Sequence, residues 1–387
     1  MFTLLLTVFI DMVGFGIIIP LTPFWAERFG ASPALVTLLF ATHSGFALVF
    51  SFVWGWVSDR WGRKPVLILS LMGSVMSFAW LGLADALWML FAARALGGVF
   101  GANIAVAQAY IADVTPPEDR AKGMGMMGAA FGLGFVLGPA IGGLLAGSDP
   151  ADPDFRTPFF VAAGVSFVAV LVGIFFLREP ERHSEPSVPR GVIERFRGFA
   201  AVMSHPRIAW PIAVIVMMAF VMAGLESTMA LWTERVHQWG PRETGYFFAY
   251  IGVLLVFIQG GLVRLAMKYV DETTCAPVAI AAMTVGIGMI PWCDEVWLVY
   301  LAGALIAFGY GLGNPMLNAL ISKGAPDDIQ GAVLGASQSA QSLCRVLGPI
   351  TAGALFSTFG RDMPYYVGGA ILIVATIAAL RITAART

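Results

Sequence analysis

The stretch Gly55-Trp-Val-Ser-Asp59-Arg60-Trp-Gly62-Arg63-Lys64 places one acid and three bases between two long apolar runs. The runs extend from Ala34 to Trp54 and from Pro65 to Ala84. A run of about twenty apolar residues is long enough to cross a bilayer as a helix. The stretch therefore predicts a short charged loop between two membrane-spanning helices. Its basic residues predict that this loop is cytoplasmic.

The composition is that of a polytopic membrane protein. Of 387 residues, 58% are hydrophobic and only 12% are charged, whereas a soluble domain carries about a quarter of charged residues. The net charge of −1 gives no field that would attract nucleic acid, so no nucleic-acid partner is expected. The three cysteines (Cys275, Cys293 and Cys344) lack disulfide or metal spacing, and we interpret them as packing residues.

Apolar runs broken by charges or by Pro and Gly predict an all-α fold of twelve transmembrane helices in two halves of six. The N-terminus enters the first run at once, without a basic segment or a cleavage site, and is interpreted as a retained helix. The expected spans are 2–24, 34–56, 65–84, 88–112, 122–146, 157–177, 208–231, 243–263, 275–293, 296–320, 331–356 and 364–384.

The distribution of basic residues supports an orientation with both termini in the cytoplasm. With these spans, the inner loops together with the inner ends of the spans carry sixteen of the 23 Lys and Arg, the outer loops carry five, and two (Arg94 and Arg345) lie deeper within spans. Such an excess on one side is the pattern of the positive-inside rule. This pattern predicts an integral membrane protein with both termini inside. We expect its location to be a bacterial inner (plasma) membrane.

The longest polar stretch, 178–207, separates an N-terminal bundle (1–177) from a C-terminal bundle (208–387). Within it, Ile193, Phe196, Phe199 and Met203 recur at near-helical spacing, which predicts an amphipathic helix on the inner membrane face. We interpret residues 178–207 as a cytoplasmic linker.

The two bundles resemble each other in sequence. Val136-Leu-Gly-Pro139 recurs as Val346-Leu-Gly-Pro349, at an offset of 210 residues. Asn103 and Asn314 are separated by nearly the same offset, 211 residues. An internal repeat in a polytopic protein is typical of an alternating-access transporter, with a site between the halves near the bilayer midplane.

Asp11 and Arg94 are the charged residues predicted inside the first bundle. An acid at mid-depth is costly unless it is paired, protonated or wetted. Asp11 could thus exchange a proton as its surroundings alternate, or it could be a structural partner of Arg94 or a substrate contact. Arg94 could pack in an ion pair, tune a carboxyl group or hold an anionic substrate.

Glu226 and Arg345 are the counterparts in the second bundle, where an ion pair is possible. Glu226 could instead reach the outer interface, and Arg345 could act as a gate or a substrate contact. His43 titrates near neutrality in water and is a further coupling candidate, although a lone His among apolar residues is more often satisfied by a neighbour.

Polar and aromatic residues in the spans predict a cavity for an amphipathic molecule, although amides also join helices and aromatic residues also pack. Besides Arg345, the candidate cavity residues are Asn103, Gln108, Tyr250, Gln259, Tyr310, Asn314, Asn318, Gln338 and Gln341.

The span 122–146 is rich in glycine, with Gly134, Gly138 and Gly142 four residues apart and Pro139 among them. This spacing removes side chains from one helix face and allows close packing, and the proline bends the helix. No catalytic triad, phosphate-binding loop or metal-ligand spacing occurs, so no enzyme, no cofactor and no metal site are expected. A membrane-embedded enzyme or a non-transporting sensor remains an alternative of another class.

Several motifs together resemble the drug:proton antiporters of the major facilitator superfamily, including the tetracycline-efflux branch. They are Asp11-x-x-Gly14-x-Gly16-x-x-x-Pro20, the Gly55–Lys64 loop, Arg94 followed by Gly97 and Gly98, and Gly138-Pro139-x-x-Gly142-Gly143. Unlike the tetracycline pumps as a group, the spans 65–84 and 275–293 contain no acid.

The resemblance implies that the loop (Gly55, Asp59, Arg60, Gly62 and Arg63) is a conformational latch. In the family, Asp59 would meet the inner start of the eleventh helix, and Arg63 would reach Asp113. Arg94 would tune proton coupling, and the Gly138-Pro139 bend would limit leak. The second-bundle copy of the loop, residues 261–268, is degenerate.

The sequence therefore predicts a monomeric secondary transporter that exports small amphipathic drugs in exchange for protons, with Asp11 as the first proton carrier and Glu226 as the second. The alternative is a proton symporter or facilitator for an organic anion, with Arg94 and Arg345 as ligands.

Overall fold

The computed structural model describes residues 1–101, 103–116, 120–147, 153–180, 206–326 and 329–384. Within these residues it contains helices and turns without strands, and twelve helical segments are long and apolar enough to span a membrane. The predicted fold class is confirmed. The predicted amphipathic helix around Ile193–Met203 lies outside the described residues.

The chain divides into two compact units. Unit 1 comprises Met1–Pro189 and Thr233–Val253, and unit 2 comprises Arg190–Trp232 and Leu254–Thr387. The domain boundaries expected from the sequence, at 177 and 208, stay a prediction.

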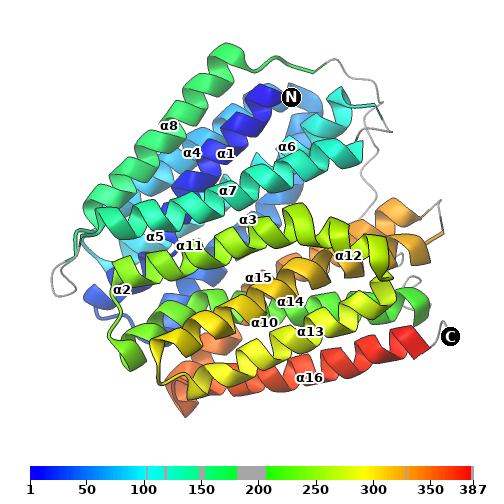
Figure 1. Ribbon diagram of the computed structural model, residues 1–387. Helices are drawn as coiled ribbons and strands as arrows, with labels where there is room; N and C mark the ends of the chain where they lie inside the picture. The colour runs from blue at the N-terminus through cyan, green and yellow to red at the C-terminus, as the bar shows by residue number, and fades with distance from the viewer. Residues whose placement is uncertain (102, 117–119, 148–152, 181–205, 327–328, 385–387) are drawn as a thin grey trace. The chain divides into compact units, whose positions relative to one another are not determined.

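Unit 1 begins with α1 (Phe2–Ile18) and α2 (Thr22–Arg28), which together form the first span. It continues with α3 (Pro33–Trp61), α4 (Arg63–Leu83), α5 (Leu87–Val99), α6 (Asn103–Val114), α7 (Arg120–Leu145) and α8 (Arg156–Phe176). Helix α1 packs against α7 and α8, and α4 packs against α8 (Figure 1).

Unit 2 contains most of α10 (Pro206–His237) and the later part of the span that begins with α11 (Pro241–Phe257). That span continues through a π-helical turn (Ile258–Leu262) into α12 (Val263–Tyr269). The remaining helices are α13 (Glu272–Met289), α14 (Val296–Gly324), α15 (Gln330–Phe359) and α16 (Met363–Ala384). Helix α13 packs against α14 and α16 (Figure 1).

The fourth span differs from the expected single helix, because α5 ends at Val99 and α6 starts at Asn103. Glycines are poor helix formers, and Gly97, Gly98 and Gly101 gather at this break. Trp54 Nε1 donates to the carbonyl of Val99 at 2.5 Å, and the Ser70 hydroxyl donates to that of Phe100. These side chains replace helical hydrogen bonds, which membrane-embedded backbone requires.

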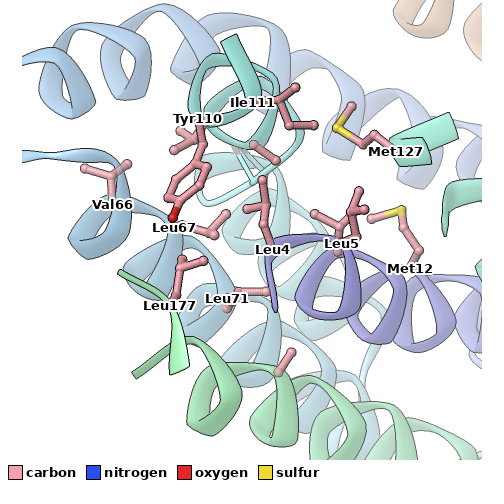
Figure 2. Close-up of a cluster of buried hydrophobic side chains, with 14 of the residues drawn as sticks. Leu4, Leu5, Met12, Val66, Leu67, Leu71, Tyr110, Ile111, Met127 and Leu177 are labelled. Carbon is pink, nitrogen blue, oxygen red and sulfur yellow. The ribbon is translucent and has the colours of Figure 1, made fainter. Parts of the chain in front are cut away.

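The core of unit 1 fills the space between α1, α4, α6, α7 and α8 with apolar side chains. Figure 2 shows Leu4, Leu5 and Met12 of α1 facing the other helices of this cluster. Tyr110 is buried in the same cluster, and its hydroxyl donates to the carbonyl of Arg178 at 2.6 Å. The first residues after α8 are thereby fixed to α6.

Helix α7 packs closely on α1 through its glycines. An added Cβ would lie 2.5 Å from the Met12 Cβ if placed on Gly134, and 2.6 Å from the Gly16 Cα if placed on Gly138. Contact distances this short leave no room for a side chain. The predicted function of the glycine spacing in close packing is therefore visible in unit 1, and Pro139 lies inside α7.

We predict that Gly138→Ala destabilises the protein by at least about 2 kcal/mol, because the added methyl group must displace the backbone of α1. Gly128→Ala is the matched control in the same helix, since an added Cβ meets nothing within 4 Å there. The control should be neutral or stabilising by about 0.5–1 kcal/mol. Thermal unfolding in detergent measures both, and equal midpoints would contradict the packing argument.

Candidate functional site

The candidate site residues belong to two groups within unit 1 and one within unit 2. In unit 1, one group is buried around Asp11 and Arg94, and the other lies at the inner ends of the helices, meaning the ends predicted to face the cytoplasm. In unit 2, polar residues come from α10, α14 and α15.

Asp11 is held in the interior of unit 1. Only 2% of the residue is exposed, and the Ser166 hydroxyl of α8 donates to its Oδ1 at 3.3 Å. Gly14 makes this approach possible, because a Cβ there would lie 2.8 Å from the Ser166 oxygen. A hydroxyl can form a hydrogen bond with either the charged or the protonated carboxyl group, since it donates to the first and accepts from the second. Ser166 was not among the sequence candidates.

Arg94 is 4% exposed and lies among aromatic rings. Its guanidinium carbon is 5.6 Å from the centroid of the Phe40 ring and 6.0 Å from that of Phe15, which is cation–π geometry. In the described part of the chain Arg94 forms no ion pair, and its Nε has no hydrogen-bond partner. The pairing with Asp11 that the sequence left open is thus not formed.

His43 belongs to α3 and lies against α5. Its ring centroid is 5.6 Å from that of Phe15, and its Nδ1 would be 3.4 Å from a Cβ on Gly97. This nitrogen, like Arg94 Nε, is buried without a hydrogen-bond partner within the described residues. His43 and Arg94 are therefore brought together around Phe15.

The loop motif forms an ion-pair network centred on Arg63. Its Nε lies 2.8 Å from Asp113 Oδ2, and its Nη1 lies 2.7 Å from Asp59 Oδ1. Nη1 also donates to Ser58 Oγ at 2.6 Å. The geometry agrees with the Arg63–Asp113 contact that the family resemblance implies. The implied contact of Asp59 with the eleventh helix stays a prediction.

Two other loop residues have different surroundings. The guanidinium of Arg60 lies over the Trp56 ring, 4.1 Å from its centroid. Gly55 has open space around it, since an added Cβ would meet nothing within 4 Å, and its carbonyl accepts from the Ser58 hydroxyl at 2.9 Å.

Glu179 completes this network and was missed by the sequence analysis. Its Oε1 accepts from the backbone N–H of Arg63 at 2.6 Å, and its Oε2 accepts from that of Lys64 at 2.9 Å. Gly62 has φ 108°, and a Cβ there would lie 2.7 Å from Glu179 Oε1. A carboxylate at a helix start satisfies free N–H groups and complements the positive end of the helix dipole.

The signal for Glu179 in the sequence was weak. It is one of several acids in the polar stretch after α8, and only the fold brings it to α4. The Lys64 ammonium adds a second link to the same region, because it donates to the carbonyl of Ile174 in α8 at 2.8 Å.

In unit 2, Glu226, Tyr310 and Arg345 interact electrostatically. Arg345 is exposed and donates to Ser342 Oγ at 3.2 Å. Among the described residues, Glu226 and Arg345 do not approach within the 4.0 Å of an ion pair. The possible pair therefore exists only as a longer-range interaction.

The amides of unit 2 form short chains along their helices. Asn318 Nδ2 donates to Asn314 Oδ1 at 2.6 Å and to the carbonyl of Asn314 at 3.0 Å. Gln341 is buried and lies 3.4 Å from Ser337 Oγ.

The other cavity candidates are less closely connected. Gln338 and Gln259 are exposed, and Gln259 lies in the π-helical turn, a feature frequent at functional sites. In unit 1, Gln108 is exposed and Tyr250 is half-buried, while the side chain of Asn103 lies outside the described residues. No group of three or more His, Cys, Asp or Glu in the described ranges could hold a metal ion.

The remaining bend residues extend the contacts of α7. Gly142 faces Ile17 of α1, and the Pro139 carbonyl would lie 2.5 Å from a Cβ on Gly245 of α11. The bend thus has backbone contacts on two sides within unit 1.

Known proteins share this arrangement of helices and motifs. Residues 4–349 match the sequence model of the Major Facilitator Superfamily. The chain belongs to the major facilitator superfamily. It is therefore an integral membrane transporter, built for a small-molecule substrate.

Curated relatives of this major facilitator protein are bacterial resistance proteins. The chain is 30% identical to the class C tetracycline resistance protein of Escherichia coli, over 95% of this chain and 93% of the relative. It is also 30% identical to multidrug resistance protein 1 of Bacillus subtilis (strain 168), over 97% and 95%. The family assignment from the sequence motifs is confirmed.

Solved structures share the fold at low identity. The human organic anion transporter MFSD10 (TETRAN) has a TM-score of 0.72 at 23% identity, covering 97% of this chain and 98% of that one. A mutant of the nucleoside transporter NupG has a TM-score of 0.81 at 10% identity, covering 98% and 99%.

We predict that Glu179→Ala lowers the free energy of unfolding by about 1–2 kcal/mol, because two N–H groups at the start of α4 lose their acceptor. Arg178→Ala is the matched control, since only its backbone carbonyl takes part in the bond to Tyr110. Thermal unfolding in detergent should separate the two variants. Equal midpoints would show that Glu179 does not cap α4.

Proposed function

We propose that this transporter exports small amphipathic molecules in exchange for protons by alternating access. The observation that carries the proposal is the buried Asp11, whose Oδ1 accepts a hydrogen bond from the neutral Ser166 hydroxyl. A buried acid that accepts a hydrogen bond from a hydroxyl can gain or lose a proton while that bonding partner stays neutral. The resistance proteins named above support export as the direction.

In the proposed cycle, Asp11 takes a proton from one side and releases it to the other as its surroundings change from dry to wet. Substrate and proton compete, so that binding of the drug favours release of the proton. Arg94, His43 and Glu226 are the proposed coupling residues. The polar residues of α14 and α15 would contact the substrate, together with Gln259.

Arg63 is the proposed centre of a conformational latch. It contacts Asp59, Asp113 and Ser58 at once. If one of these contacts breaks, the Arg63 guanidinium keeps the others, so the free-energy cost of the rearrangement is low. The bend at Pro139 would limit leak. We also propose a monomer in a bacterial inner membrane with both termini cytoplasmic, supported by the bacterial relatives and by the excess of inner basic residues.

A second candidate function is transport of an organic anion. Arg94 supports it, because the buried guanidinium forms no ion pair among the described residues and keeps an unpartnered Nε. A carboxylate is the ligand that would satisfy such a group. Arg345, which is exposed, would be the second ligand.

We predict that adding transported drugs to the purified protein in weakly buffered detergent releases protons, and that Asp11→Asn abolishes this release. Asp85→Asn is the control, because Asp85 is an exposed acid between α4 and α5. Release from Asp11→Asn equal to that from wild type would move the carrier to Glu226 or His43. If only an organic anion causes a response, and the response is proton uptake, the second candidate replaces efflux.

We predict that Arg63→Gln lowers the transport rate in proteoliposomes about tenfold, because a partly buried ion-pair network loses its centre. Arg60→Gln should lower it less than about twofold, since Arg60 lies over Trp56 and an exposed charge contributes little. Equal effects of the two substitutions would contradict a latch centred on Arg63. Rates are normalised to folded protein, which is measured by size-exclusion chromatography.

A further inference from the structure

Unit 2 contains an ion pair that the proposed function does not use. Lys323 Nζ of α14 contacts Glu272 Oε1 of α13. The Glu272 side chain is 9% exposed and that of Lys323 is 57% exposed. A nearly buried carboxylate of this kind needs its partner, whereas an exposed surface pair contributes little.

The position of this pair in the second bundle matches that of Arg63 and Asp113 in the first. Glu272 is the first residue of α13, as Arg63 is of α4. Lys323 stands one residue before the end of α14, as Asp113 does in α6.

The spacing along the chain supports the match. Glu272 follows Arg63 by 209 residues and Lys323 follows Asp113 by 210, the offset of the Val-Leu-Gly-Pro repeat. The pairs are therefore repeat-related, with their charges exchanged. The loop sequence at 261–268 is degenerate, so the ion pair is the part of the latch that the second bundle retains.

The exchange of charges changes how each pair interacts with its helices. A helix start favours an acid and a helix end favours a base. Glu272 and Lys323 satisfy both preferences, whereas Arg63 and Asp113 satisfy neither. For the first bundle, Glu179, which follows α8, supplies the acid at the start of α4. In the second bundle, Glu272 itself brings the acid to the start of α13.

Helix α14 gives this pair a function beyond local stability. Pro315 lies inside α14, and an interior proline removes a helical hydrogen bond and permits bending. Asn314 and Asn318 flank the proline, and Lys323 lies on the side toward the inner end. The contact with Glu272 therefore fixes the segment that follows Pro315.

We propose that Glu272 and Lys323 are positioning residues for transport, a charge-reversed counterpart of the Arg63–Asp113 pair that sets the bend of α14 at its polar residues. The inference rests on the proposed function, because the affected step is substrate handling by α14. It adds a second inner contact that the loop motif does not reveal.

The test compares Glu272→Gln, Lys323→Gln and the exchanged double variant Glu272→Lys/Lys323→Glu. Asp271→Asn is the matched control, since this exposed acid is the neighbour of Glu272. The first readout is export of ethidium, a fluorescent amphipathic cation, from proteoliposomes, with kcat and KM measured separately. The second is the rate at which N-ethylmaleimide labels the buried Cys275, three residues after Glu272, in a Cys293→Ala/Cys344→Ala background.

We expect each neutral variant to change kcat or KM about tenfold while the amount of folded protein stays unchanged. Cys275 labelling should accelerate as the inner end of α14 is released. The exchanged variant should recover part of both properties, because the pair is restored with each charge at the unfavourable helix end. Asp271→Asn should match wild type in kcat and KM. Because Asp271 and Glu272 both act electrostatically on the Cys275 thiol, the labelling rate of each neutral variant is compared with that of Asp271→Asn.

Neutral variants that behave like Asp271→Asn in both readouts would overturn the inference. It would also be overturned if labelling accelerates while kcat and KM stay unchanged, since the pair would then be only structural. Failure of wild type to export ethidium would contradict the proposed function instead, and Cys275 labelling would still decide whether the pair fixes α14. Arg63→Gln serves as the positive control for the latch.

Discussion

The absence of water inside a bilayer is the constraint on which this structure depends. Every polar backbone group in the spans needs an internal partner. The break between α5 and α6 illustrates the consequence, because the Trp54 indole and the Ser70 hydroxyl bind the carbonyls of Val99 and Phe100 there. Close packing has to replace the hydrophobic effect between helices. The glycines of α7 achieve this against α1 by bringing the backbones into contact.

The same constraint makes each buried charge informative. Asp11 and Arg94 are both nearly inaccessible, yet their surroundings differ. A hydroxyl oxygen approaches Asp11, whereas aromatic rings lie around the Arg94 guanidinium, whose own Nε has no hydrogen-bond partner among the described residues. A protonatable acid and a permanently charged base inside one bundle are suited to coupling a proton to a second ligand. This is the physical basis of both proposed functions, which differ in the charge of that ligand.

The inner ends of the helices carry opposite arrangements of charge in the two copies of the repeat. In the first bundle, the base Arg63 stands at a helix start and the acid Asp113 near a helix end. Glu179 compensates by accepting a hydrogen bond from the backbone N–H at the start of α4. In the second bundle, Glu272 and Lys323 agree with both helix dipoles without further help. A pair opposed by its helices and shared among several partners is easier to rearrange than one that they favour. The asymmetry is consistent with a switch in the first bundle and a fixed anchor in the second.

The sequence by itself determined the fold class, the number of spans and the family, because hydrophobic length and basic loops follow from the bilayer and need no tertiary information. The glycine spacing also predicted the close-packed face of α7, and the family resemblance implied the contact of Arg63 with Asp113. Only the tertiary structure decided which groups meet across helices. Ser166 reaches Asp11, Glu179 caps α4, Arg94 lies among aromatic rings, and Glu272 meets Lys323. The reason is that spacing along one helix fixes a face, whereas the partner of that face depends on helix packing, which no local pattern encodes.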